Sequence, residues 1–98
     1  MARFDVFHMP EGGYVVDCQT DYLDHLDTRF VIPLAPRDKT PVIDRRLNPT
    51  FLIDDEPFVL QTQWAAAVSR YDLGKPVGSL AADGPAITAA IDRLTSGF

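Results

Sequence analysis

Three adjacent carboxylates, Asp54-Asp55-Glu56, form the densest group of potential metal ligands in the chain. Carboxylate oxygens bind hard cations such as Ca²⁺ when several of them converge on one point. Consecutive positions on a turn do not converge in this way, and no histidine or further acid lies close by in the sequence. Because Pro57 follows at once, we interpret the triplet as the solvated tip of a tight hairpin rather than a metal site.

The other side chains with catalytic or ligating chemistry are isolated along the chain. Cys18 is the single cysteine and has no histidine or basic cluster beside it, which favours a small buried side chain over a nucleophile. His8 and His25 lie far apart and in no metal-ligand spacing. There is no Gly-rich phosphate loop, nucleophile elbow or zinc-binding pattern. We therefore expect no catalytic residues, no metal and no cofactor, and a protein-binding module rather than an enzyme.

Charge and length limit the partners. The formal net charge of −5 and the isoelectric point near 4.7 argue against binding to a nucleic-acid backbone, and they permit a basic protein partner instead. Arg45-Arg46 is the only basic doublet and is interpreted as solvated surface. A chain of 98 residues suits one domain over residues 1–98, in a size range where a homodimer is expected. With no long apolar stretch and no possible internal disulfide, the cytoplasm is the expected compartment, with no membrane association.

Alternation of apolar and polar side chains predicts short strands. Residues 3–8 alternate with Phe4, Val6 and His8 on one side, and the Pro10 and Gly12-Gly13 turn leads to a returning strand over 14–19. Further strands are expected at Arg29–Leu34, Thr50–Ile53 and Phe58–Thr62, and after the turn Leu73–Gly78, while Trp64–Val68 fits either a helical turn or a strand.

Pro33 makes the strand Arg29–Leu34 unusual. Proline donates no hydrogen bond to a ladder, so a central strand is not expected to tolerate it. A long polar loop over residues 21–28 precedes this strand and carries two candidates for a binding surface, Tyr22 and Leu23. The strand and its loop therefore restrict the set of possible folds more than the composition does.

The last element is the clearest helix. Asp83 is expected to cap it, Pro85 is tolerated in its first turn, and Gly97 is a stop signal. One apolar stripe at helical spacing is predicted to face the core, formed by Ile87, Ala90, Ile91 and Leu94. Several short strands followed by one terminal helix predict a mostly β fold, an antiparallel barrel closed or capped by that C-terminal α-helix.

Five segments together resemble the CcdB family, whose members are toxins of type II toxin–antitoxin pairs. The similarity runs from the first strand to the final glycine, and Val31 to Ala35 is its most specific part. The segments are Val16–Asp21, Arg29–Ala35, Ile53–Glu56, Leu73-Gly74 and the helix Ile87–Gly97.

The resemblance implies a homodimer of SH3-like barrels, an architecture shared with the MazF ribonuclease toxins, with a small additional sheet and a long C-terminal helix. Members of the family are not enzymes. They bind the A subunit of DNA gyrase with their C-terminal ends and trap its cleaved-DNA complex. A CcdA-like antitoxin is implied as a second partner, with a disordered segment that folds on the toxin.

The resemblance also implies the gyrase-binding positions. The family ends in Trp-Gly-Ile and its tryptophans stack on an arginine of gyrase, whereas this chain ends in Ser96-Gly97-Phe98. A cation–π contact contributes about 0.5–2 kcal/mol per ring, so the loss of two rings would weaken the complex by about one to three powers of ten. Phe98 is the alternative source of a ring. The implied contact residues are Tyr22, Leu23, Asp92, Thr95, Ser96, Gly97 and Phe98.

Two alternatives remain open. The first is a MazF-like endoribonuclease toxin, against which the low isoelectric point counts. The second is a degenerate CcdB homologue that still binds antitoxin but poisons gyrase weakly, because Ser96 stands where the family has tryptophan.

Overall fold

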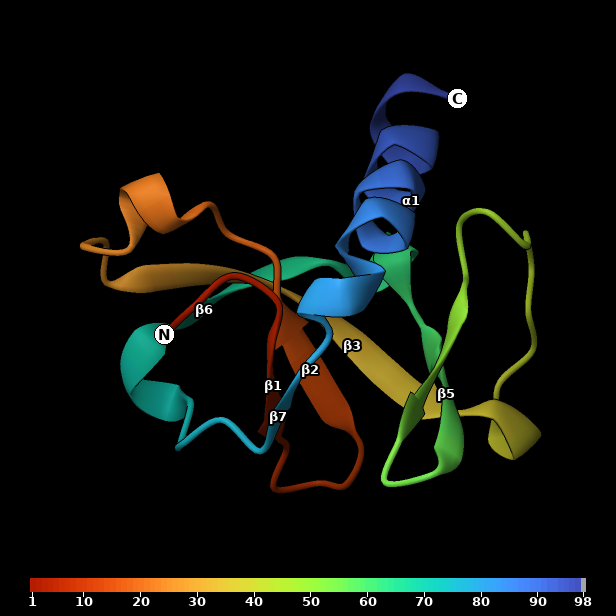
Figure 1. Ribbon diagram of the computed structural model, residues 1–98, viewed down its shortest axis with the longest axis horizontal. Helices are drawn as coiled ribbons and strands as arrows, with labels where there is room; N and C mark the ends of the chain where they lie inside the picture. Colours follow the sequence, from red (N-terminus) through yellow and green to blue (C-terminus); the bar gives the residue numbers. More distant parts are fainter. Residues whose placement is uncertain (98) are drawn as a thin grey trace.

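A nearly closed antiparallel barrel with one helix at its C-terminal end forms the molecule (Figure 1). This computed structural model describes residues 1–97. Within them the strands are ordered β4-β5-β3-β2-β1-β7, and β6 pairs with β3. The predicted fold class is thus confirmed. The elements are β1 (Asp5–His8), β2 (Tyr14–Asp17), β3 (Thr28–Pro36), β4 (Thr50–Ile53), β5 (Glu56–Leu60), β6 (Ala66–Ser69), β7 (Gly78–Ser79) and α1 (Gly84–Ser96).

The first hairpin follows the predicted turn. Gly12 and Gly13 both have positive φ, 97° and 75°, and the Met9 amide donates to the Gly13 carbonyl at 3.1 Å. The first strand begins at Asp5 rather than Arg3, because Phe4 adopts a φ of 71° that no strand residue can have. Val6 and Phe7, the next residues of β1 after Asp5, are both buried, and they belong to the clusters on opposite faces of the sheet.

Pro33 lies in the central strand of the sheet, so the expectation that a central strand would exclude it is wrong. On one side, β3 pairs with β2 along Val31–Leu34. On the other side β3 changes partner, pairing with β6 up to Val31 and with β5 from Leu34 onwards. Pro33 lies between these two paired segments, where no strand needs a hydrogen bond from the N–H that proline lacks. Its carbonyl accepts from the Gln61 amide at 2.9 Å.

The hairpin of β4 and β5 has the predicted acidic tip. Asp54 and Asp55 form a two-residue turn with φ of 52° and 66°, conformations that aspartate tolerates better than most side chains. The ambiguous segment 64–68 turns out to contain both alternatives, a 3₁₀ helix at Thr62–Trp64 followed by strand β6.

Both faces of the sheet bury apolar side chains. A smaller cluster of Phe7, Val15 and Val31 lies on the face opposite α1. The main core lies between the sheet and α1, and Cys18 is buried in it as predicted. Its members are Phe4, Val6, Val16, Cys18, Ile32, Leu34, Phe51, Phe58, Leu60, Leu80, Ile87 and Ala90.

A buried ion pair joins β2 to β3. Asp17 and Arg29 have fully buried side chains, and Arg29 Nε donates to Asp17 Oδ2 at 2.9 Å. Nη2 lies 2.6 Å from the same oxygen without hydrogen-bond alignment, and Nη1 has no partner within residues 1–97. Asp17 Oδ1 accepts from the Gln19 amide at 3.0 Å. Removal of either charge would therefore leave the other buried and uncompensated.

Helix α1 begins and ends where the sequence predicts. Asp83 occupies the N-cap position, although its side chain makes no capping hydrogen bond, and Gly97 ends the helix with a φ of 80°. Gly84 packs so closely on the core that a Cβ there would lie 2.8 Å from the Phe4 ring. Glycine is thus the residue that lets the first turn of α1 approach the barrel.

The apolar stripe of α1 is buried only in its first half. Ile87 and Ala90 are fully buried and Ile91 is partly buried, but Leu94 is 47% exposed, so its predicted place in the core is wrong. The reason is geometric, because α1 projects away from the barrel and its last turn has no sheet beneath it (Figure 1). The last turn of the helix is therefore exposed to solvent.

We expect Arg29→Met to lower the free energy of unfolding by about 3–5 kcal/mol, because Asp17 would become an unpaired buried carboxylate. Urea unfolding at neutral pH measures the loss. The double variant Arg29→Met/Asp17→Leu should recover most of it, since no buried charge remains. The exposed control Arg45→Met should stay within about 0.5 kcal/mol of wild type. Unchanged stability of Arg29→Met would contradict this account of the pair.

Candidate functional site

The end of α1 presents four of the predicted contact residues to solvent. Asp92, Thr95, Ser96 and Gly97 are all exposed. The Thr95 hydroxyl donates to the Ile91 carbonyl at 2.9 Å, so it is occupied within the helix. The Gly97 amide donates to the Asp92 and Arg93 carbonyls at 3.1 and 3.2 Å, which closes the helix. The seventh position, Phe98, lies outside the described residues.

Arg93 fixes this helix end to the loop before β4. Its Nε and Nη2 donate to Asp44 Oδ2 at 3.3 and 3.1 Å, and its Nη1 donates to the Gly97 carbonyl at 3.0 Å. Asp44 Oδ1 accepts from the amides of Arg46 and Leu47 at 2.9 and 3.0 Å. The hydrogen bond from Leu47, followed by that from Arg93, lowers the pKa of Asp44 below its ordinary value of 3.8. At neutral pH the carboxylate is ionised and holds Arg93 in place.

The other two predicted contact residues, Tyr22 and Leu23, lie on a 3₁₀ helix formed by Asp21–Leu23. Tyr22 is 92% exposed and Leu23 is 44% exposed. Arg70 anchors this loop by donating to the carbonyls of Asp24 and Leu26 at 2.9 and 3.3 Å. The loop thus presents a large aromatic side chain from a backbone that is tied to the rest of the barrel.

The two groups of contact residues are not brought together within one chain. The loop around Tyr22 extends from one side of the barrel, whereas Asp92 to Gly97 lie at the far end of α1 on the other side (Figure 1). One molecule alone therefore offers two separate surfaces.

Trp64 is an exposed aromatic that the sequence analysis did not assign to any surface. It is 67% exposed on the 3₁₀ helix Thr62–Trp64, and this element packs against α1. Leu94, farther along α1, is also exposed. The exposure of Leu94 has no signal in the sequence, because it depends on which part of α1 the barrel covers.

The described residues contain neither a cluster of metal ligands nor a reactive thiol. Within residues 1–97, no three His, Cys, Asp or Glu side chains gather as potential metal ligands. Burial raises the pKa of Cys18 to about 12, with Asp17 adding to the effect, so the thiol stays protonated at neutral pH. No helix in this part of the chain has the length and apolar character needed to cross a bilayer.

Comparisons with known proteins place this fold among bacterial toxins. A structure described as a crystal structure of an Mtb toxin is 22% identical, with 90% of this chain and 97% of that chain covered and a TM-score of 0.69. The Mycobacterium tuberculosis toxin MazF-mt6 is 19% identical, with 94% of each chain covered and a TM-score of 0.72. At these identities the similarity is one of fold.

The sequence itself gives the family. The family described as CcdB protein matches residues 3–97, nearly the whole chain. The protein belongs to the CcdB family, as its resemblance indicated, and this membership supports a toxin. No curated protein matches the chain.

We expect the ion pair between Arg93 and Asp44 at the helix end to persist from neutral pH down to about 4. Because the folded pKa of Asp44 lies below its ordinary value of 3.8, its contribution to stability is fully present above pH 3.8 and is lost as the pH falls through the folded pKa. NMR titration of the Asp44 carboxyl and the Arg93 Nε–H measures this. Asp44→Asn should abolish the pH dependence at Arg93, whereas a wild-type Asp44 that titrates at or above 3.8 would contradict it.

Proposed function

We propose that this protein is the toxin of a type II toxin–antitoxin pair and poisons DNA gyrase by binding its A subunit. The observation that carries the proposal is the family match over residues 3–97. In this role the chain makes and breaks no covalent bond. The protein acts by binding its target. The contact surface consists of the end of α1 and the loop around Tyr22. We infer that it acts in the cytoplasm, where gyrase is.

The chemistry of the helix end supports a protein partner. Asp92 adds an exposed carboxylate to a chain of net charge −5, which suits a basic surface on gyrase. Arg93 offers no free charge there, because Asp44 and the Gly97 carbonyl already engage it. Leu94 supplies exposed hydrocarbon beside these polar groups. Such a mixture of apolar and polar side chains is typical of non-obligate interfaces.

Two further partners belong to this proposal. A homodimer would carry two helix ends and two Tyr22 loops, and so could join surfaces that a single chain keeps apart. Exposed Trp64 and Leu94 supply apolar area for such contacts. A CcdA-like antitoxin that covers the end of α1 would compete with gyrase and neutralise the toxin.

Induction of the gene in bacteria without an antitoxin should stop growth and accumulate gyrase covalently bound to cleaved DNA, while cellular RNA stays intact. Tyr22→Ala should weaken the effect, because it removes an exposed contact side chain. Leu52→Ala is the matched control, since Leu52 is 66% exposed on strand β4, outside the proposed surface. Degraded RNA with no cleaved complexes would favour the MazF-like ribonuclease, and normal growth with soluble protein would refute a toxin.

Ser96→Trp tests whether potency is limited by the missing aromatic ring. If a cation–π contact is absent from the wild-type complex, restoring one ring per subunit should increase gyrase affinity by about ten- to a thousandfold. Titration of purified gyrase A fragment measures the change, with Ser96→Ala as the control of similar size to wild type. A wild-type protein that already poisons gyrase fully would refute the degenerate-toxin alternative.

A further inference from the structure

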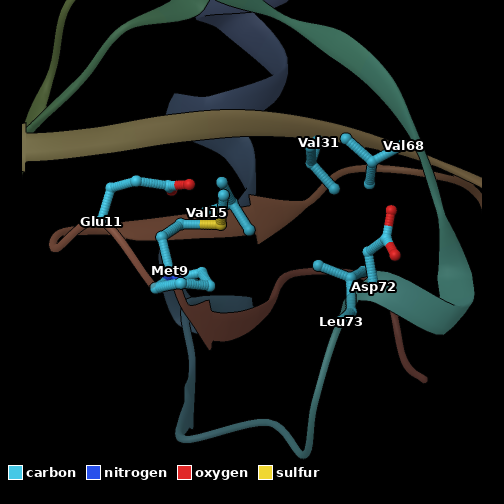
Figure 2. Close-up of a pocket in the computed structure, with 8 residues that line it drawn as sticks. Met9, Glu11, Val15, Val31, Val68, Asp72 and Leu73 are labelled. Carbon is cyan, nitrogen blue, oxygen red and sulfur yellow. The ribbon is translucent and has the colours of Figure 1, made fainter.

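An apolar pocket opens on the face of the sheet opposite α1 (Figure 2). Side chains alternate between faces along a strand, so Val15 and Val31 point away from the core that α1 covers. The pocket has a volume of about 360 Å³, at the small end of the range for ligand sites. It has room for one or two side chains and is too small for a whole helix.

The floor of the pocket is hydrocarbon. Val15 and Val31 are 4% and 2% exposed, and Val68 of β6 lies beside them. Met9 and Leu73 pack on the same cluster from the loops around it. Such a site favours an apolar side chain, because inserting one removes from water its own hydrocarbon and that of the partly exposed Met9, Val68 and Leu73.

Two carboxylates stand at the sides of this floor. Glu11 comes from the β1–β2 hairpin and Asp72 from the 3₁₀ helix Arg70–Asp72, and Figure 2 shows them on opposite sides of the valines. Within residues 1–97 neither carboxylate takes part in an ion pair. No lysine or arginine lines the pocket. Its charge is therefore uncompensated and negative around an apolar centre.

We propose that this pocket is a second protein-binding site, which takes a short basic amphipathic segment of a partner. An apolar side chain of the segment rests on Val15, Val31 and Val68. A neighbouring lysine or arginine reaches Glu11 or Asp72, with its own hydrocarbon stem lying along the floor. Charge complementarity selects this partner, since the exposed carboxylates of Glu11 and Asp72 attract a lysine or arginine and repel an acidic segment.

The position of the pocket separates it from the helix end of the proposed gyrase surface. Since it lies on the other face of the sheet from α1, a partner held there leaves the helix end accessible. A partner in the pocket and another at the helix end can thus be bound at once, and this site exists whether or not α1 binds gyrase.

Titration of the methyl-labelled protein with two short peptides tests the site. The probe is N-acetyl-Leu-Arg-amide, and N-acetyl-Leu-Glu-amide is the matched peptide of opposite charge. The Leu-Arg peptide should shift the methyl signals of Val15, Val31 and Val68. It should bind about fivefold more tightly than Leu-Glu, and this preference should shrink in high salt.

A pair of charge variants separates this site from the general acidity of the protein. Glu11→Gln/Asp72→Asn should bind the two peptides equally, while Asp54→Asn/Asp55→Asn removes the same charge from a distant turn and should keep the preference. No methyl shifts, equal binding of both peptides to wild type, or an unchanged preference in the first variant would each overturn the proposal. Concentration-dependent shifts confined to the Val15, Val31 and Val68 methyl signals without peptide would also overturn it, because they would assign the pocket to a second copy of this chain.

Discussion

The buried pair of Asp17 and Arg29 is the constraint on which the rest of the structure depends. It fixes how β2 lies against β3, and a slip of one residue would move Arg29 onto the face that forms the main core. Because β3 touches β2, β5 and β6, its register also sets where the sheet changes partner at Pro33. This alignment places Val15 and Val31 on one face of the sheet and the core that packs against α1 on the other face.

Local signals explain what the sequence could predict. The glycine pair at 12–13 and Gly97 need backbone conformations that few other residues adopt, so turns and helix ends were found correctly. Pro33, Leu94 and Trp64 were misjudged or missed because their surroundings depend on tertiary structure. The environment of Pro33 depends on which strands flank β3, that of Leu94 on how far α1 extends past the barrel, and that of Trp64 on the packing of its 3₁₀ helix.

The candidate surfaces were predictable to different degrees. The exposure of Tyr22 was anticipated from its place in a long polar loop, whereas the role of the helix end was anticipated through the family resemblance. The pocket could not be anticipated, because Val15, Val31 and Val68 share a face only once three strands are in register. The two faces of a sheet can make different contacts. Here one face packs against α1, and the other carries the apolar pocket with Glu11 and Asp72 at its sides.

The contacts of Arg93 have a consequence for the thermodynamics of association. A free helix terminus samples many conformations, and a partner that binds it must restrict them at a cost in conformational entropy. Arg93 holds both Asp44 and the Gly97 carbonyl in the unbound protein. The last turn of α1 is thus preorganised before any partner arrives, and more of the free energy of each contact it makes is retained as affinity.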